Sequence, residues 1–249
     1  MSNVFGLIGN PLTHSFSQEY FTQKFQTEGL TNYQYRLFPL KKISELKILI
    51  ANYPHLKGLN VTIPYKKLVV PYLDQLSHEA SDTEAVNCIK IERHYGKPFL
   101  VGYNTDIFGF EQSLKPILKS WHKKAIILGT GGSASAVAFV LKSLKIGCFF
   151  VSRNPSGMNQ VAYGSLGKDF MREHHLIVNA TPLGMFPDTG RCPDIPYDQI
   201  TKKHLLFDLI YNPEETLFLK KGSEKGAMVK NGIQMLHFQA EKSWEIWQD

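Results

Sequence analysis

The segment 124–144 restricts the fold of this chain more than any other, because it places a glycine-rich turn between a strand pattern and a helix pattern. Residues 124–128 run from basic to apolar, as a buried strand does, and 133–144 have helical periodicity. Gly129, Gly131 and Ala134 match the spacing G-x-G-x-x-A. The first glycine permits a tight turn, the second lets the backbone approach a pyrophosphate, and the small third residue lets helix and strand pack closely. We therefore predict a dinucleotide-binding turn at residues 129–133, although such a turn can also serve packing alone.

The residues after the next predicted strand, 148–151, indicate which dinucleotide binds. Sites that prefer NAD usually carry an acidic side chain here to bind the ribose 2′-hydroxyl. This chain instead has Ser152, Arg153 and Asn154. A guanidinium group can pair with a 2′-phosphate and stack on adenine, so the segment predicts NADP (NADPH) as cofactor. The alternative is that Arg153 is an ordinary exposed loop residue.

The rest of the chain alternates between short apolar segments and amphipathic ones, which is typical of an α/β fold with a parallel sheet. We predict strands at 4–8, 33–38, 59–63, 176–179 and 205–209, helices at 16–28, 44–52 with Ser44 as N-cap, 66–76, 106–118 and 235–247, and a hairpin of 86–91 with 98–102 around Tyr95-Gly96. The character of the sequence changes near residue 105. We expect two domains: an N-terminal α/β substrate domain of residues 1–104 with the C-terminal helix 233–249, and a Rossmann-type dinucleotide-binding domain of residues 105–232.

Composition limits the classes of function. The 249 residues are 43% hydrophobic and 20% charged, with a net charge of +6 that is scattered along the chain. Scattered charge argues against nucleic-acid binding, and the longest apolar runs are too short to cross a bilayer. Three widely spaced cysteines, Cys88, Cys148 and Cys192, show no metal-binding spacing. Together with an N-terminus that lacks a charged leader, these cysteines predict a cytoplasmic protein without a bound metal. For the oligomeric state we expect a monomer or a homodimer, and the sequence does not choose between them.

Polar side chains gather beside the predicted strand ends of the N-terminal half. Ser15 and Ser17 stand close to a helix start, where two hydroxyl groups can hold a carboxylate but more often cap the helix. Residues 60–66 place an amide, a hydroxyl and an amine around one turn. Read alone, Lys66 is a solvated lysine at the beginning of a helix, and Asp106 is a first-turn carboxylate.

Taken together and in order, the motifs GNPLTHSFS, NVTIPYK, EAVN, GYNTD, GTGGSASA, NATPLGM, DLIYNP and NGIQMLHFQA resemble the shikimate dehydrogenase family. The resemblance extends from residue 6 to about residue 247. It implies an enzyme of two α/β domains that interconverts shikimate and 3-dehydroshikimate with NADP, a step toward chorismate and the aromatic amino acids.

The resemblance also implies roles for individual residues. Lys66 and Asp106 match the catalytic pair, in which Lys66 takes the proton of the alcohol during oxidation and Asp106 orients both the hydroxyl and Lys66. The implied substrate-binding residues are Ser15, Ser17, Thr62, Asn87, Tyr211 and Gln239. The implied cofactor-binding residues are Gly129, Thr130, Gly131, Gly132, Ser133, Ser152, Arg153, Asn154, Asn179, Thr181, Leu209, Gly232 and Met235.

The chain departs from the family pattern at a few positions. Gln18 and Cys88 replace a common proline and a common threonine, and Ser152 and Asn154 flank Arg153 in place of asparagine and threonine. Two alternatives stay open: a relative that accepts quinate with relaxed cofactor choice, and a non-catalytic ligand-binding paralogue on the same fold. Retention of both Lys66 and Asp106 argues against the second.

Overall fold

The computed structural model describes residues 3–12 and 15–249 and divides into two compact units. The first unit comprises residues 1–105 and 240–249, and the second comprises residues 106–239. The division falls inside two helices, α5 (Thr105–Leu114) and α9 (Ile233–Gln248). The domain limits of the folded protein, 1–104 with 233–249 and 105–232, stay a prediction.

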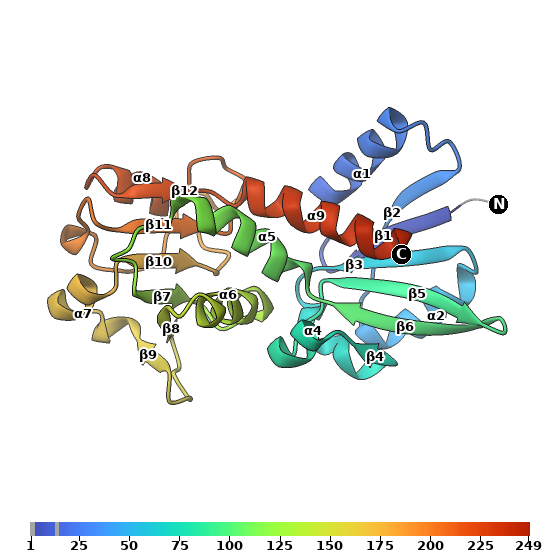
Figure 1. The fold of residues 1–249 in the computed structure, drawn as a ribbon, viewed down its shortest axis with the longest axis horizontal. Helices are drawn as coiled ribbons and strands as arrows, with labels where there is room; N and C mark the ends of the chain where they lie inside the picture. Colours follow the sequence, from blue (N-terminus) through green and yellow to red (C-terminus); the bar gives the residue numbers. More distant parts are fainter. Residues whose placement is uncertain (1–2, 13–14) are drawn as a thin grey trace. The chain divides into compact units, whose positions relative to one another are not determined.

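The first unit is built on a six-stranded mixed sheet in the order β2-β1-β3-β5-β6-β4 (Figure 1). Its strands are β1 (Asn3–Gly9), β2 (Tyr33–Pro39), β3 (Leu56–Val61), β4 (Gln75–Leu76), β5 (Cys88–His94) and β6 (Lys97–Tyr103). Strands β1, β2 and β3 are parallel, as expected of strand–helix units. Strands β5 and β6 form the predicted hairpin, and Tyr95 and Gly96 both have positive φ, as a two-residue turn requires.

The helices of the first unit are α1 (Phe16–Thr27), α2 (Leu46–Asn52), α3 (Tyr65–Leu68) and α4 (His78–Thr83). The predicted helix 66–76 is wrong. Helix α3 ends at Leu68, a short 3-10 helix follows at Val70–Tyr72, and β4 comes next, because Pro71 has no N–H to continue an α-helix. The predicted N-cap Ser44 is also wrong: it lies within a 3-10 helix, Ile43–Glu45, and Glu45 stands at the N-cap of α2.

Alternate residues of β1 face two cores, one on each side of the first sheet. Val4 and Ile8 pack with residues of α2 and α4, whereas Phe5 and Leu7 pack with α1 and the end of α9. Aromatic rings fill the second of these cores. The ring of Phe5 lies 4.9 Å from that of Trp247, and a Cβ at Gly58 would overlap the Trp247 indole. Only glycine therefore lets the last turn of α9 approach β3 this closely.

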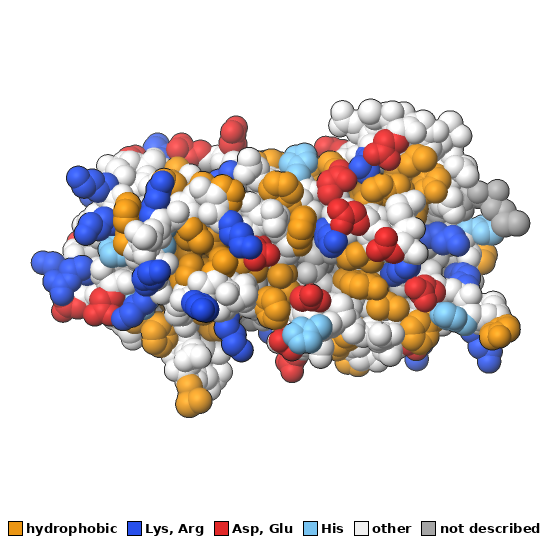
Figure 2. All heavy atoms as spheres, viewed as in Figure 1, with side chains coloured by type: hydrophobic (Ala, Val, Ile, Leu, Met, Phe, Trp, Pro, Cys, Tyr) orange, Lys and Arg blue, Asp and Glu red, His pale blue; other side chains and the backbone are white. Residues whose placement is uncertain are grey.

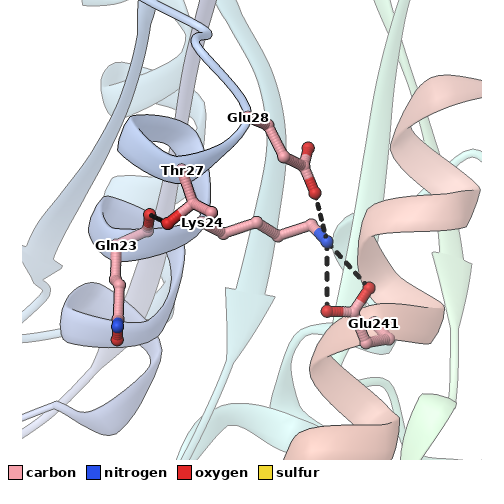
Figure 3. A network of polar contacts seen from close by, with 5 residues as sticks. All are labelled: Gln23, Lys24, Thr27, Glu28 and Glu241. Carbon is pink, nitrogen blue, oxygen red and sulfur yellow. Dashed lines mark hydrogen bonds and ion pairs between the residues drawn. The ribbon is translucent and has the colours of Figure 1, made fainter.

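A polar contact on the surface also links α9 to α1. Figure 3 shows the Lys24 ammonium of α1 between two carboxylates, 2.8 Å from Glu28 and 3.0 Å from Glu241 of α9. Both carboxylates are partly exposed, so water screens this network and its contribution to stability is small. The last turns of α9 are held in this unit mainly by buried contacts, such as the aromatic packing of Trp247 and its hydrogen bond to the carbonyl of Ile89.

The second unit is built on a fully parallel six-stranded sheet in the order β12-β11-β10-β7-β8-β9 (Figure 1). Its strands are β7 (Lys124–Leu128), β8 (Gly147–Ser152), β9 (Gln160–Ala162), β10 (Leu176–Asn179), β11 (Leu205–Asp208) and β12 (Met228–Lys230). Its helices, besides parts of α5 and α9, are α6 (Gly132–Ser143), α7 (Lys168–Glu173) and α8 (Leu217–Ser223). The strand order reverses between β7 and β10, which is the place where ligands bind in open parallel sheets.

Two separate cores cover the two faces of this parallel sheet. Ile127, Val178 and Phe207 pack with residues of α5 and α6, whereas the neighbouring Ile126 and Leu206 pack with residues of α7 and α8. This arrangement confirms the predicted parallel sheet with helices on both faces. Strands β9 and β12 and helices α7 and α8 were not predicted, because their short segments carry little periodicity.

Charge and apolar surface are mixed on the exposed face. Figure 2 shows basic, acidic and apolar side chains interspersed over both units. Within residues 3–12 and 15–249, none of the helices is both long and apolar enough to cross a membrane.

Two buried histidines precede strands of the second sheet and are held in the neutral form. In both His122 and His204, Nδ1 accepts a hydrogen bond from the backbone N–H three residues earlier, at 3.0 Å. Their Nε2 atoms donate to backbone carbonyls, at 3.2 Å to Lys203 and 3.1 Å to Met171. A proton on Nδ1 would face an N–H donor. Burial, the largest cause, lowers the pKa of both rings.

We therefore expect the free energy of unfolding to fall as the pH is lowered from 7.5 to 5.5. The unfolded chain takes up these protons near pH 6.5, above the folded pKa, so the stabilisation is complete above that pH and is lost as the pH falls toward the folded pKa. Each extra proton bound on unfolding lowers stability by about 1.4 kcal/mol per pH unit. Urea denaturation at several pH values measures this slope.

The matched comparison is the variant His122→Asn/His204→Asn, whose amides still accept a hydrogen bond but do not titrate. Its stability should depend less steeply on pH than that of the wild type. Asp208 acts in the opposite sense, because burial raises its pKa to about 6, but both proteins carry it, so the difference isolates the histidines. Equal slopes in the two proteins would show that these rings do not control acid stability.

Candidate active site

Within the first unit, the segments that carry predicted substrate residues meet at one edge of the sheet. The N–H of Thr62 donates to Ile8 at 2.9 Å, and the N–H of Asn10 donates to Ile63 at 3.1 Å, which joins the carboxyl ends of β1 and β3. Strand β5 runs antiparallel to β3, so its first residue also lies at this edge. The carbonyl of Lys66 accepts from the N–H of Val86 at 2.8 Å, next to Asn87. Strand order thus gathers residues that are far apart in the sequence.

Ser15 is the N-cap of α1, which is the role that such a serine has more often than carboxylate binding. Its Oγ accepts a hydrogen bond from the N–H of Gln18 at 3.3 Å. This contact does not conflict with ligand binding, since a hydroxyl group that accepts one hydrogen bond can still donate its own proton. Residues 13 and 14, between the motif's proline and Ser15, lie outside the described residues.

A buried series of hydrogen bonds connects the side chains next to this edge of the sheet. The Tyr35 hydroxyl of β2 donates to Oδ1 of Asn60 at 2.7 Å, and Nδ2 of Asn60 donates to Ser243 of α9 at 3.0 Å. Ser243 lies 3.1 Å from the hydroxyl of Thr105. The N–H of Thr105 in turn donates to Oδ1 of Asn87 at 2.7 Å. All five side chains are buried, so each bond avoids the cost of an unpaired polar atom.

One end of this series reaches a predicted substrate residue. Burial raises the pKa of Tyr35 well above its usual value, and a hydrogen bond with Ser17 partly offsets the effect. The buried series of hydrogen bonds therefore extends from Ser17 to Asn87, which are 70 residues apart in sequence. Tyr35, Thr105 and Ser243 were not singled out from the sequence, because nothing local marks a buried tyrosine or serine as part of a site.

The predicted catalytic pair lies on two helices. Lys66 is half-buried in α3, and Asp106 is buried in the first turn of α5. Both side chains make further interactions within the structure. Lys66 belongs to the first unit and Asp106 to the second, so their approach to one another stays a prediction.

The glycine turn of the second unit has the form that a dinucleotide needs. Gly129 has φ of +105°, which side chains other than glycine rarely tolerate, and a Cβ there would lie 3.1 Å from Thr181. Gly131 is the N-cap of α6 and supplies no side-chain hydrogen bond, and a Cβ there would meet open space. The helix therefore presents backbone N–H groups and a partial positive charge at an open position, which fits a phosphate group.

The other predicted cofactor residues follow the carboxyl ends of neighbouring strands. Ser152 ends β8, and its Oγ accepts from the N–H of Asn154 at 3.1 Å, while Arg153 between them is exposed. Asn179 ends β10, and Thr181 lies in the following turn. Leu209 and Tyr211 follow β11, Gly232 precedes α9, and Met235 is buried within its first turns. These positions share the carboxyl edge of the parallel sheet.

Gln239 belongs to the second unit, as the last of its residues, and not to the first. Its side chain is buried, and its Nε2 donates to the carbonyl of Leu236 at 2.9 Å. Two surface cavities lie elsewhere in the first unit, one of about 590 Å³ between α1 and β2 and one of about 530 Å³ beside α2. None of the predicted site residues lines either cavity.

The three cysteines are free, as predicted. Burial raises the pKa of Cys88 to about 12, so this residue, which replaces a common threonine, is an inert thiol. Among residues 3–12 and 15–249, there is no cluster of three or more side chains suited to hold a metal ion.

Comparison with known proteins decides the family. Residues 7–89 match the model of the shikimate dehydrogenase substrate binding domain. In an alignment of 264 positions, this chain is 36% identical to the shikimate dehydrogenase (NADP(+)) of Methanococcus maripaludis. The alignment covers 99% of this chain and 91% of the relative. The chain belongs to the shikimate dehydrogenase family.

Solved structures of shikimate dehydrogenase family members agree with this assignment. A chorismate mutase/shikimate 5-dehydrogenase fusion protein from Clostridium acetobutylicum matches with a TM-score of 0.87 and 34% identity, covering 100% of this chain and 92% of that one. The Thermus thermophilus enzyme in complex with NADP(H) and shikimate matches with a TM-score of 0.84 and 29% identity, covering 99% and 93%. Quinate dehydrogenase from Corynebacterium glutamicum in complex with NAD also matches, with a TM-score of 0.84 and 26% identity over 99% and 93%.

Proposed function

We propose that this protein is an NADP-dependent shikimate dehydrogenase, which reversibly reduces 3-dehydroshikimate to shikimate in the route to chorismate and the aromatic amino acids. One observation carries the proposal. The chain joins a glycine turn suited to a dinucleotide, at the carboxyl edge of a parallel sheet, to a unit whose own strand ends gather Ser15, Ser17, Thr62, Lys66 and Asn87.

In this proposal the hydroxyl groups of Ser15 and Ser17 bind the substrate carboxylate. Thr62, Asn87, Asp106 and Gln239 contact the ring hydroxyls. Tyr211 lies on the substrate side. The buried series of hydrogen bonds through Tyr35, Asn60 and Ser243 orders these groups before substrate arrives, which lowers the entropic cost of binding.

Lys66 accepts the proton of the reacting alcohol during oxidation and returns it to the carbonyl oxygen during reduction. Asp106 orients both the reacting hydroxyl and Lys66. A carboxylate beside an amine favours the ammonium form, whereas a base must be neutral, so removal of water around the pair has to favour the amine. A general base positioned in this way accelerates a reaction by about 10²- to 10⁴-fold.

The cofactor residues bind NADP through backbone and charge. The N–H groups at the beginning of α6, after Gly129, Gly131 and Gly132, hold the pyrophosphate with Thr130 and Ser133, and Arg153 pairs with the 2′-phosphate between Ser152 and Asn154. Asn179, Thr181, Leu209, Gly232 and Met235 surround the nicotinamide end. Bound NADP⁺ supplies the hydride acceptor, and NADPH the hydride donor.

We further propose a cytoplasmic monomer or homodimer that binds neither nucleic acid nor membranes. Free thiols and the interspersed surface charge in Figure 2 support this proposal. Size-exclusion chromatography with light scattering measures the oligomeric state.

An assay at 340 nm tests the proposed reaction. Purified protein should reduce NADP⁺ with shikimate, much faster than it reduces NAD⁺ with shikimate or either cofactor with quinate. Quinate with NAD⁺ as the best pair would instead favour the quinate dehydrogenase alternative, which the Corynebacterium match motivates. Binding of cofactor and shikimate without turnover would favour a non-catalytic protein.

A further inference from the structure

A buried carboxylate in the second unit takes no part in the chemistry described above. Asp208 is the last residue of β11 and is fully buried. Its Oδ1 accepts from Nδ2 of Asn179 and from the N–H of Ile210, both at 3.0 Å. Its Oδ2 accepts from the hydroxyl of Thr216 at 2.6 Å. These partners are uncharged, so the structure buries a carboxylate without a cation to offset the loss of water.

Burial in these surroundings is costly for a carboxylate, and it raises the pKa of Asp208 to about 6. A carboxylate at neutral pH nevertheless has a property that suits the position: both of its oxygens accept and neither donates. It therefore dictates the orientation of any amide beside it. Residues that break a rule of burial in this way often serve a site.

Asp208 and the carbonyl of Leu183 together fix how the Asn179 amide is turned, since Nδ2 of Asn179 donates to Asp208 at 3.0 Å and to Leu183 at 3.4 Å. Because Nδ2 of Asn179 donates to Asp208, Oδ1 of Asn179 points to the other side. There it accepts from the N–H of Thr181 at 3.0 Å and from the Thr181 hydroxyl at 2.7 Å. If the Asn179 amide were rotated by 180°, its NH₂ group would face the N–H and the hydroxyl of Thr181, which are donors as well. The carboxylate at the end of β11 thus holds the turn that follows β10.

That turn lies against the glycine turn, at the reversal of strand order. The N–H of Ala180 donates to Leu128 at 3.0 Å, and the space where Gly129 lacks a side chain faces Thr181. On the other side, the N–H of Gly232 donates to the carbonyl of Ile210 at 3.0 Å. Asp208 therefore contacts the loops after β10 and β11 directly, through Asn179 and Ile210, and the loop after β10 packs on the glycine turn after β7.

We propose that Asp208 is a positioning residue for the cofactor: by orienting the Asn179 amide it holds the Thr181 turn in the shape that receives the nicotinamide end of NADP. This inference rests on the proposed function. It assigns the effect to the acceptor atoms of Asp208, not to its charge, and it concerns the nicotinamide end alone. The adenosine end would bind at the turn after β8, around Arg153.

Two substitutions of similar shape separate the effect of the acceptor atoms of Asp208 from the effect of its charge. In Asp208→Asn, Oδ1 can still accept from Asn179 and Ile210, and the new amide N–H can donate to the Thr216 hydroxyl. Asp208→Leu keeps the branched shape and removes both acceptors. Thr216→Val is the control, since it removes the bond at Oδ2 together with the N-cap of α8 and leaves the Asn179 side intact.

Binding is measured by calorimetry with two probes, NADPH and 2′,5′-ADP, which carries only the adenosine end with its 2′-phosphate. We expect Asp208→Leu to weaken NADPH binding at least 10-fold and to leave 2′,5′-ADP binding within twofold of the wild type. Asp208→Asn and Thr216→Val should bind NADPH within threefold of the wild type. A role in stability alone would move both probes together, in step with each variant's Tm.

The outcomes distinguish this inference from the proposed function. A wild-type protein that binds neither probe would contradict the proposed function itself. A wild type that binds both, with a folded Asp208→Leu variant that binds NADPH equally well, would overturn the role of Asp208 alone. Equal losses in Asp208→Leu and Asp208→Asn would overturn the claim that acceptor geometry matters.

Hydrogen exchange on the wild-type protein provides a test that needs no variant. NADPH should slow exchange in the peptides covering 179–184 and 208–212, although Asp208 itself is too deeply buried to touch the cofactor. The probe 2′,5′-ADP should not slow exchange there. Protection by NADPH that spares both peptides would contradict the proposed link.

Discussion

Replacing Lys66 with alanine should lower kcat by about 10²- to 10⁴-fold, because the reacting alcohol would lose its proton acceptor. The Kd for NADPH should stay within about threefold, since the cofactor residues belong to the second unit. The contact that Lys66 makes with Val86 uses the backbone carbonyl, which alanine retains, so the variant should fold. Initial rates at saturating shikimate and NADP⁺ measure the loss.

The neighbouring lysine provides the control. Lys67 lies on the same short helix and is exposed, so Lys67→Ala changes the net charge equally and should keep kcat within about twofold. Asp106→Asn tests the second member of the pair: it keeps the shape of the side chain and should also lower kcat strongly. Near-normal turnover in Lys66→Ala would refute its role as the base.

Replacing Arg153 with alanine should lower kcat/KM for NADP⁺ by about 10- to 100-fold and leave kcat/KM for NAD⁺ nearly unchanged. The difference arises because only NADP⁺ carries the 2′-phosphate, and a charge-assisted hydrogen bond of this kind contributes about 1.5–3 kcal/mol. Steady-state kinetics with each cofactor at saturating shikimate give both values. Cofactor preference should therefore shift toward NAD⁺.

Arg172→Ala is the matched control for this substitution. Arg172 is exposed, belongs to the same unit and pairs with Asp169, so its removal takes away an equal charge. It should affect both cofactors by less than about twofold. Equal losses with NADP⁺ and NAD⁺ in Arg153→Ala would show that Arg153 does not read the phosphate.

Local pattern predicted most of the elements that carry the site. The strand before Gly129 and the helix after it lie where the spacing of small and apolar residues puts them, within one residue. The hairpin around Tyr95-Gly96 was predicted from its turn residues, which adopt the required positive φ. The predictions of secondary structure failed where the periodicity was weak or where a proline opposed it. Pro71 interrupts the apparent helix 66–76, and the missed elements β9, β12, α7 and α8 are only three to seven residues long, too short for clear periodicity.

The sequence by itself determined the chemistry available to this protein: the glycine spacing of the dinucleotide turn, the absence of an acid beside Arg153, and the motifs that contain Lys66 and Asp106. These depend on residues close together in the chain, where propensity and spacing act directly. Only the tertiary structure decided which buried groups hold them in place. Asn60 meets Ser243 across 183 residues, and Asn179 meets Asp208 across 29. Such pairs depend on strand order and register, which follow from packing of the whole unit and leave no mark in the local sequence.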